Sequence, residues 1–234
     1  YMSVYKISLN QNVLEAAEER ITWTLENLPR VCVSFSGGKD SGLMLHLTAN
    51  LARKLHKKIN VLFIDWEAQF SCTIRYITAL REMYADVIDH FYWVALPLTT
   101  QNALSQFQPE WQCWEPNTQW VRQPPPDAIT DPGYFPFYQS GMTFEQFVRE
   151  FADWFSNKRP AAMMIGIRAD ESYNRFVAIA SLRKQRFADD KPWTTAAPGG
   201  HTWYIYPLYD WKTADIWTWF GRTNLPCNPL YNLM

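Results

Sequence analysis

Two periodicities of apolar residues alternate along this chain and predict strands that alternate with helices. Five short apolar or aromatic runs indicate strands, at residues 31–35, 60–65, 90–96, 161–167 and 203–206. Between most of them, apolar residues recur every three or four positions, as on one face of an amphipathic helix. These helical patterns cover residues 12–28, 41–55, 70–84, 143–157 and 213–220. The first runs are nearly continuous, which is typical of strands buried on both faces of a parallel sheet, so the pattern predicts an α/β fold.

One segment interrupts this alternation and is rich in proline and tryptophan. Seven prolines and three tryptophans lie between Phe107 and Phe137. Proline forbids a continuous helix or inner strand, whereas tryptophan favours burial, so an ordered, irregular insertion is predicted over about residues 107–141. Loops of that length usually have a function. The insertion is therefore either a lid or partner surface, or a structural cover over the sheet.

The overall composition is that of one globular domain, residues 1–234, with the insertion inside it. Hydrophobic residues make up 47% of the chain and charged residues 19%, which favours a sizeable core over disorder. No apolar stretch approaches the length of a membrane helix and no secretory signal is visible, so we expect a cytoplasmic protein without membrane contact. The net charge of −1 disfavours direct binding to nucleic acid. The four cysteines are scattered without a C-x-x-C pair, so neither zinc nor an iron–sulfur cluster is expected.

The most informative local pattern is a glycine turn, Ser-Gly-Gly-Lys-Asp-Ser at residues 36–41, between the first strand and its helix. Gly37 and Gly38 permit backbone angles that are closed to other residues and allow a ligand to approach the main chain closely. The free amide groups and the dipole of a helix N-terminus favour an anion at such a turn. The turn therefore predicts a phosphate-binding loop, with an ordinary tight turn as the alternative.

Charged and hydroxyl side chains of this loop extend the prediction. Lys39, Ser36 and Ser41 would add donors to a phosphate, whereas Asp40 would repel the anion unless a cation lay between them. Asp40 is therefore a candidate magnesium ligand. The pattern differs from the Walker A motif, because Gly38-Lys39 is followed by Asp40 rather than by Ser or Thr.

Further candidates follow other predicted strands. Asp65 ends the second strand, at the edge where ligands gather in open α/β sheets, although a solvated loop acid is the alternative. Arg168 and Arg175 follow the fourth strand and offer fork-shaped donors for an oxyanion. They lie at the edge of the phosphate-binding loop if the sheet is parallel, and we predict that both bind one extended nucleotide. The alternative is a pair of surface arginines bonded to Asp170 and Glu171.

Three motifs in order resemble a known family. The loop at 36–41 resembles the PP-loop of the adenine-nucleotide alpha-hydrolase superfamily. Together with Gly-Ile-Arg-Ala-Asp-Glu-Ser-Tyr-Asn-Arg at 166–175 and Tyr-Pro-Leu-Tyr-Asp-Trp at 206–211, it resembles the phosphoadenosine phosphosulfate (PAPS) reductase family over about residues 30–230. In detail the chain is similar to the IbrA/YbdN group, which is linked to gene regulation and to a ParB-like partner. The resemblance implies a five-stranded parallel sheet in the order 3-2-1-4-5, with helices on both faces.

The resemblance also implies residue roles. A bound ATP, PAPS or APS would have its phosphates on the loop and its sulfate or phosphate end near the second motif. The implied binding residues are Ser36, Gly37, Gly38, Lys39, Asp40, Ser41, Gly166, Arg168, Glu171, Ser172 and Arg175, and of these Lys39, Asp40, Arg168 and Arg175 are the candidate catalytic residues. Family reductases use a cysteine in a C-terminal Glu-Cys-Gly-Leu-His motif, which these residues lack, so we do not expect reduction by this chain alone and expect that the native protein continues beyond residue 234.

Three functions are compatible with these features. The first is an ATP pyrophosphatase or nucleotidyltransferase that cleaves ATP between its α- and β-phosphates and adenylates an acceptor such as sulfate. The second is a PAPS/APS reductase-type sulfonucleotide enzyme of sulfur metabolism that lacks its usual C-terminal cysteine. The third is a non-catalytic nucleotide-binding regulator of transcription, acting on a ParB-like partner through the insertion. A homo-oligomer is compatible with each.

Overall fold

The computed structural model describes residues 10–102, 107–180 and 184–233. Its main sheet has six strands in the order β3-β2-β1-β6-β8-β7. Their bounds are β1 Arg30–Ser34, β2 Ile59–Ile64, β3 Ile88–Val94, β6 Ala161–Ile165, β7 Thr194–Ala196 and β8 Thr202–Ile205. The first five strands of this order are mutually parallel and correspond to the predicted order 3-2-1-4-5, which is confirmed.

The predicted strand number was one too low, because β7 pairs antiparallel with β8 and adds a sixth strand at the edge. This strand has only three residues, Thr194–Ala196, and no apolar run to mark it. The chain turns back between β7 and β8 at Gly199 and Gly200, both of which have positive φ. Such a short edge strand depends on its partner for its conformation, so periodicity alone gives no signal for it.

Six α-helices were assigned in the described residues: α1 Val13–Asn27, α2 Lys39–Lys54, α3 Ser71–Met83, α4 Phe144–Ser156, α5 Tyr173–Ala180 and α6 Thr213–Thr223. In the described part of the chain, no helix is both long enough and apolar enough to cross a membrane. Short 3-10 turns lie at Pro132–Tyr134 (η1) and Pro229–Asn232 (η2), and a small antiparallel ladder joins β4 Thr99–Gln101 to β5 Glu110–Gln112.

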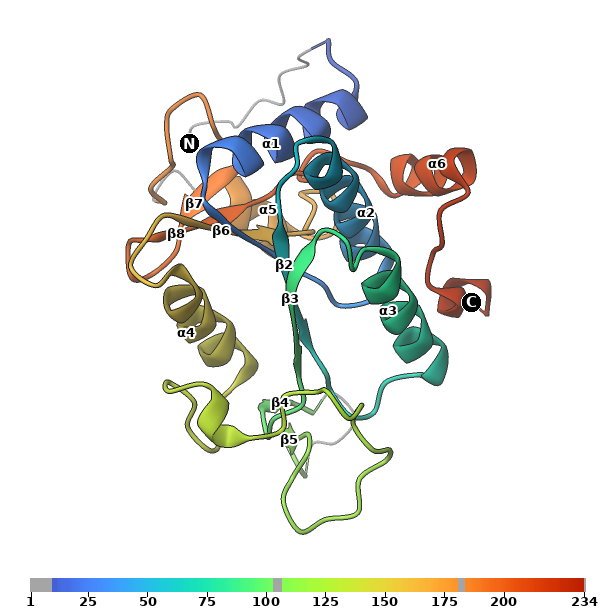
Figure 1. Ribbon diagram of the computed structural model, residues 1–234, viewed down its shortest axis with the longest axis vertical. Coiled ribbons are helices and arrows are strands. Elements are labelled where there is room, and N and C mark those ends of the chain that lie inside the picture. The colour runs from blue at the N-terminus through green and yellow to red at the C-terminus, as the bar shows by residue number, and fades with distance from the viewer. Residues whose placement is uncertain (1–9, 103–106, 181–183, 234) are drawn as a thin grey trace.

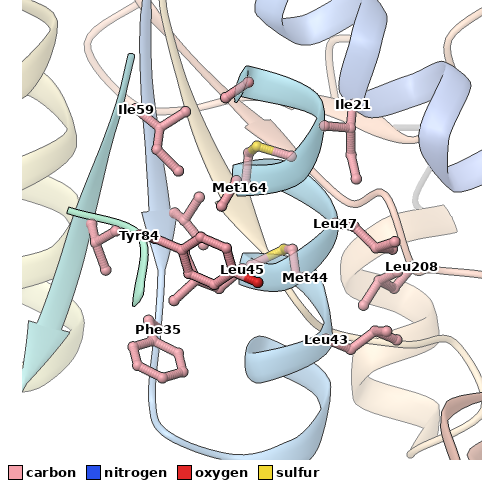
Figure 2. Close-up of a cluster of buried hydrophobic side chains, with 14 of the residues drawn as sticks. Ile21, Phe35, Leu43, Met44, Leu45, Leu47, Ile59, Tyr84, Met164 and Leu208 are labelled. Carbon is pink, nitrogen blue, oxygen red and sulfur yellow. The ribbon is translucent and has the colours of Figure 1, made fainter. Parts of the chain in front are cut away.

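Helices cover both faces of the sheet, as predicted. Alternate residues of β1 divide between two cores: Val31 and Val33 belong to one, and Cys32 to the other. The first core joins α1, α2, α3 and α6 to the sheet, and the second joins it to α4. Figure 1 shows α4 on one side of β2 and β3, and α2 and α3 on the other. Figure 2 shows the first core packed around α2, where Leu43, Met44 and Leu47 lie near side chains from α1 and the strands.

The proline- and tryptophan-rich insertion lies largely against the second core. Cys113, Trp114 and Phe135 are buried there with phenylalanines of α4. Ile129 forms a parallel bridge with Val94 at the end of β3. Buried aromatic side chains therefore hold this irregular segment against the sheet, while Phe107 at its start is fully exposed.

Candidate functional site

The glycine loop has the geometry of an anion site at a helix N-terminus. Gly37 has a φ of +77°, and a Cβ atom there would lie 2.9 Å from the side chain of Ile77. Gly38 is the N-cap of α2 and provides no side-chain hydrogen bond to the first turn. The hydroxyl groups of Ser36 and Ser41 lie 3.0 Å apart across the loop. Backbone amides and two hydroxyl groups therefore gather where the positive end of the helix dipole points.

Two cations converge on the one carboxylate of this loop. Lys39 donates from Nζ to Oδ2 of Asp40 at 2.7 Å, and Arg168 donates from Nε to Oδ1. The three side chains are mostly buried, with exposed fractions of 19% for Lys39, 14% for Asp40 and 3% for Arg168. Glu171 lies 3.8 Å from Arg168 and 3.2 Å from Arg175, so the larger group has three positive and two negative charges and a net charge of about +1. The cluster can therefore accept an anionic ligand even though Asp40 is part of it.

Gly166 lets the end of β6 approach the start of α2. A Cβ atom at Gly166 would lie 3.3 Å from backbone atoms of Asp40 and Ser41, which cannot move aside as a flexible side chain could. The chain then continues directly to Arg168. The glycine thus brings the second motif to the phosphate-binding loop, as the parallel sheet predicts.

The third motif also contacts Arg168. The guanidinium group of Arg168 donates to the carbonyl of Trp211 and to the hydroxyl of Thr213, both at 3.3 Å. Asp210 in turn accepts two hydrogen bonds from Arg20 of α1, at 2.7 and 2.8 Å. Trp211 of the third motif and Thr213, which follows it, therefore hold Arg168 in place.

Arg175 is placed differently from Arg168. Its side chain is about half exposed, and its Nε lies 3.2 Å from Glu171. Glu171 also accepts a hydrogen bond from the backbone amide of Arg168 at 3.2 Å, and Ser172 caps Arg175 through its hydroxyl. Glu171 therefore links the two arginines. That both bind one nucleotide stays a prediction.

Asp65 faces the insertion. Its side chain is fully buried, and its oxygens accept hydrogen bonds from Trp93 Nε1 at 2.7 Å and from Arg122. Nearby, Glu67 accepts from the backbone amides of Trp114 at 2.6 Å and Val121 at 2.8 Å. These two acids after β2 attach the insertion to the sheet edge. Contact between Asp65 and a nucleotide stays a prediction, and in this structure the carboxylate is enclosed by protein groups.

Sequence reasoning missed two residues of the C-terminal segment. Asn228, which is buried, donates to the carbonyl of Gly37 at 2.8 Å. The hydroxyl of Tyr231 accepts the backbone N–H of Lys39 at 3.1 Å. Figure 1 shows this segment descending from α6 beside α3. The Asn-Pro-Leu-Tyr sequence at 228–231 was the available signal, since it resembles a family segment, but nothing local showed what it contacts.

Comparison with known protein families shows to which family this chain belongs. Residues 30–233 match the phosphoadenosine phosphosulfate reductase domain. The chain belongs to this family. It is also 81% identical over 233 residues to YbdN of Escherichia coli strain K12, an uncharacterized protein. The match covers 100% of this chain and 57% of YbdN, so the chain spans little more than half the length of that relative.

Solved structures share the fold of this PAPS reductase family member. The PAPS reductase of Candida auris, a phosphate complex, aligns with a TM-score of 0.52 and 14% identity, covering 98% of this chain and 94% of that one. The FMN adenylyltransferase of Candida glabrata aligns with a TM-score of 0.50 and 17% identity, over 96% of this chain and 62% of that one. Yeast FAD synthetase in complex with FAD aligns with a TM-score of 0.50 and 16% identity, over 96% of this chain and 65% of that one.

The donor set of this family member does not form a magnesium site by itself. In the described part of the chain, no group of three or more His, Cys, Asp or Glu side chains could hold a metal ion. Asp40 is the predicted ligand, and Lys39 and Arg168 already occupy its two oxygens. Magnesium usually binds one or two carboxylates together with substrate phosphates. Asp40 would therefore have to exchange a cation partner to bind it.

A buried histidine links α2 to the same C-terminal segment. His46 Nε2 donates to the carbonyl of Pro226 at 2.8 Å, which leaves Nδ1 to accept the hydroxyl of Tyr84 at 2.6 Å. Burial of the imidazole lowers the pKa of His46 to about 4. Protonation would charge a buried ring and convert its acceptor nitrogen into a donor.

We therefore expect the free energy of unfolding to fall as pH is lowered through the window from about 6.5, the pKa of an unfolded histidine, to about 4. In that window the unfolded chain binds the proton and the folded chain does not, so His46 contributes a slope of at most about 1.4 kcal/mol per pH unit. Denaturant titration at several pH values measures the slope. His46→Gln should reduce it, whereas His56→Gln, at an exposed position, should leave it unchanged. Equal slopes in wild type and His46→Gln would contradict the assignment.

Proposed function

We propose that this chain binds an adenine nucleotide with its phosphates on the loop at residues 36–41. The observation that carries the proposal is the convergence of Lys39 and Arg168 on Asp40 beside the start of α2, where the N-cap residue Gly38 has no side chain to cap the helix. Excess positive charge, backbone amides whose present partners are hydroxyl groups that a phosphate could replace, and a helix dipole at one place favour a phosphate. Membership of the PAPS reductase domain family supports an adenine nucleotide as the ligand.

The reaction we propose is cleavage of ATP between its α- and β-phosphates. An oxygen of the acceptor forms a bond to the α-phosphorus, the bond to the bridging oxygen breaks, and pyrophosphate leaves with the electron pair. Lys39 and the amides of the loop would oppose the negative charge that develops on the phosphate oxygens. Arg168 would act mainly by holding Asp40, because its side chain is almost fully enclosed. The fold is shared with a protein named an adenylyltransferase, so the architecture is compatible with this chemistry.

Family membership favours a sulfonucleotide ligand, PAPS or APS, as the second candidate. Cys227 lies in the segment that contacts the loop, but burial raises the pKa of its thiol, despite an opposing effect of Lys39. A thiol with a raised pKa is a weaker nucleophile at neutral pH, because less of it is thiolate. We therefore place Cys227 outside the chemistry and propose binding, rather than reduction, for a sulfonucleotide. Binding without turnover would correspond to the regulatory function, with a ParB-like protein as the proposed partner.

Calorimetric titration with ATP and PAPS, together with a pyrophosphate-release assay with and without sulfate and magnesium, tests these proposals. We expect Lys39→Ala to weaken nucleotide binding about ten- to a hundredfold, since a hydrogen bond from a charged group contributes roughly 1.5–3 kcal/mol. Lys54→Ala, at the other end of α2, is the matched control and should bind as wild type does. Tighter binding of PAPS than ATP would favour the sulfonucleotide candidate, and ATP binding without pyrophosphate release the regulator. No binding of either nucleotide would overturn the proposal.

A further inference from the structure

Asn228 of the C-terminal segment is buried against the glycine turn and is hydrogen-bonded to the backbone carbonyl of Gly37. It is 3% exposed and comes from the residues just before η2. Its amide nitrogen donates to the carbonyl of Gly37 at 2.8 Å and to the hydroxyl of Thr73 at 2.9 Å. Its amide oxygen accepts the backbone N–H of Leu230 at 3.0 Å. Both donor hydrogens and the acceptor are thus engaged, and the side chain has one fixed orientation.

The contact with Gly37 also determines where the next amide points. The peptide bond between Gly37 and Gly38 is trans, and in a planar trans peptide the carbonyl and the N–H point in opposite directions. Because Asn228 holds the carbonyl, the N–H of Gly38 is turned away from Asn228. This N–H donates to Ser36 Oγ at 3.4 Å, a long hydrogen bond that a stronger acceptor could replace.

Glycine residues need such a restraint more than others do. A peptide between two glycines rotates easily, because neither residue has a Cβ atom to limit its angles. Gly37 already has a φ of +77°. If the peptide rotated, the carbonyl of Gly37 could face the ligand in place of the N–H of Gly38, and an acceptor would then face a phosphate.

We infer that Asn228 is a positioning residue that orients the backbone N–H of Gly38 toward a bound phosphate. The inference rests on the proposed function and adds a residue to that site. Tyr231, from the same C-terminal segment, accepts the backbone N–H of Lys39, so this one segment holds the turn on both sides of Gly38.

The test compares three variants of the full chain. Asn228→Ser removes the donor to Gly37 but can still cap Leu230, and it adds no charge. Asn228→Asp keeps the shape and the cap and removes both donors. Thr73→Val is the matched control, because it has nearly the same shape and removes only the other hydrogen bond of Asn228. Two measurements are made on each variant. The first is the NMR spectrum of protein labelled with ¹⁵N-glycine, in which the nine glycines of the chain give the signals. The second is the calorimetric affinity for ATP and for adenosine.

We expect both Asn228 variants to shift or broaden the amide signals of Gly37 and Gly38 and to weaken ATP binding about tenfold, with adenosine affinity unchanged. Adenosine has no phosphate, so a general loss of structure would affect both ligands, whereas misorientation of one amide affects ATP alone. Thr73→Val should resemble wild type in both measurements. Unchanged ATP affinity in Asn228→Ser, or an equal loss in Thr73→Val, would overturn the inference. Failure of wild type to bind ATP would instead show that the proposed function is wrong.

Discussion

Replacing Arg168 with alanine should destabilise the protein by about 3 kcal/mol or more. The guanidinium group is 3% exposed and has four partners, among them Asp40 and the carbonyl of Trp211. Its removal leaves a mostly buried carboxylate with Lys39 as its one remaining charged partner in the described structure and leaves a buried carbonyl without its donor. For a domain of this size the loss corresponds to a fall in Tm of roughly 6–12 °C. Differential scanning calorimetry of the variant measures it.

Arg175→Ala is the control for this experiment. Its side chain is about half exposed and its ion pair with Glu171 lies at 3.2 Å, so its loss should change the free energy of unfolding by less than about 1 kcal/mol. The two arginines look alike in the sequence, and the contrast comes from the burial of Arg168 and from its larger number of partners. Similar destabilisation by the two substitutions would show that Arg168 is not the support of the loop that its contacts indicate.

Replacing Asp65 with alanine should destabilise the protein by about 3–5 kcal/mol and loosen the insertion. The carboxylate is fully buried, and its removal leaves Arg122 without its charged partner and Trp93 Nε1 without its acceptor. Glu67 would remain attached to Trp114 and Val121, so we expect the insertion to exchange faster rather than to detach. Hydrogen exchange measured by mass spectrometry over residues 107–141, with denaturant titration, gives both quantities.

Glu115→Ala is a matched control within the insertion, since its side chain is exposed and the substitution keeps the backbone carbonyl that accepts hydrogen bonds from Thr118 and Trp120. It should leave exchange and stability near wild type. Rapid exchange throughout 107–141 in the wild-type protein would contradict the view that this segment is an ordered cover. Wild-type stability in Asp65→Ala, combined with weaker nucleotide binding, would return Asp65 to the ligand site.

The sequence was sufficient for the parallel part of the sheet and for the position of the glycine turn between β1 and α2, because both depend on local patterns. Apolar runs mark buried strands wherever they lie, and a glycine pair between strand and helix has few alternatives. Arg168 was also found, through its motif, but its enclosure behind Asp40 was not, because burial depends on Trp211 and Thr213 from a distant segment. Asp65 was expected to contact a ligand, because ligands of open α/β sheets bind at the carboxyl ends of the strands. Its partner, Arg122, comes from an irregular insertion whose path no periodicity predicts.

The contacts that complete the loop join residues very far apart in the chain. Asn228 and Gly37 are separated by 191 positions, Tyr231 and Lys39 by 192, and Arg20 and Asp210 by 190. During synthesis the glycine turn therefore leaves the ribosome long before the residues that orient it. A nascent chain can form β1 and α2 early, since these contacts are local, but its loop remains unrestrained until the last segment docks. Nucleotide binding would then require that residues 30–231 have folded together, so a nucleotide would stabilise a nascent chain only after residue 231 has been synthesised.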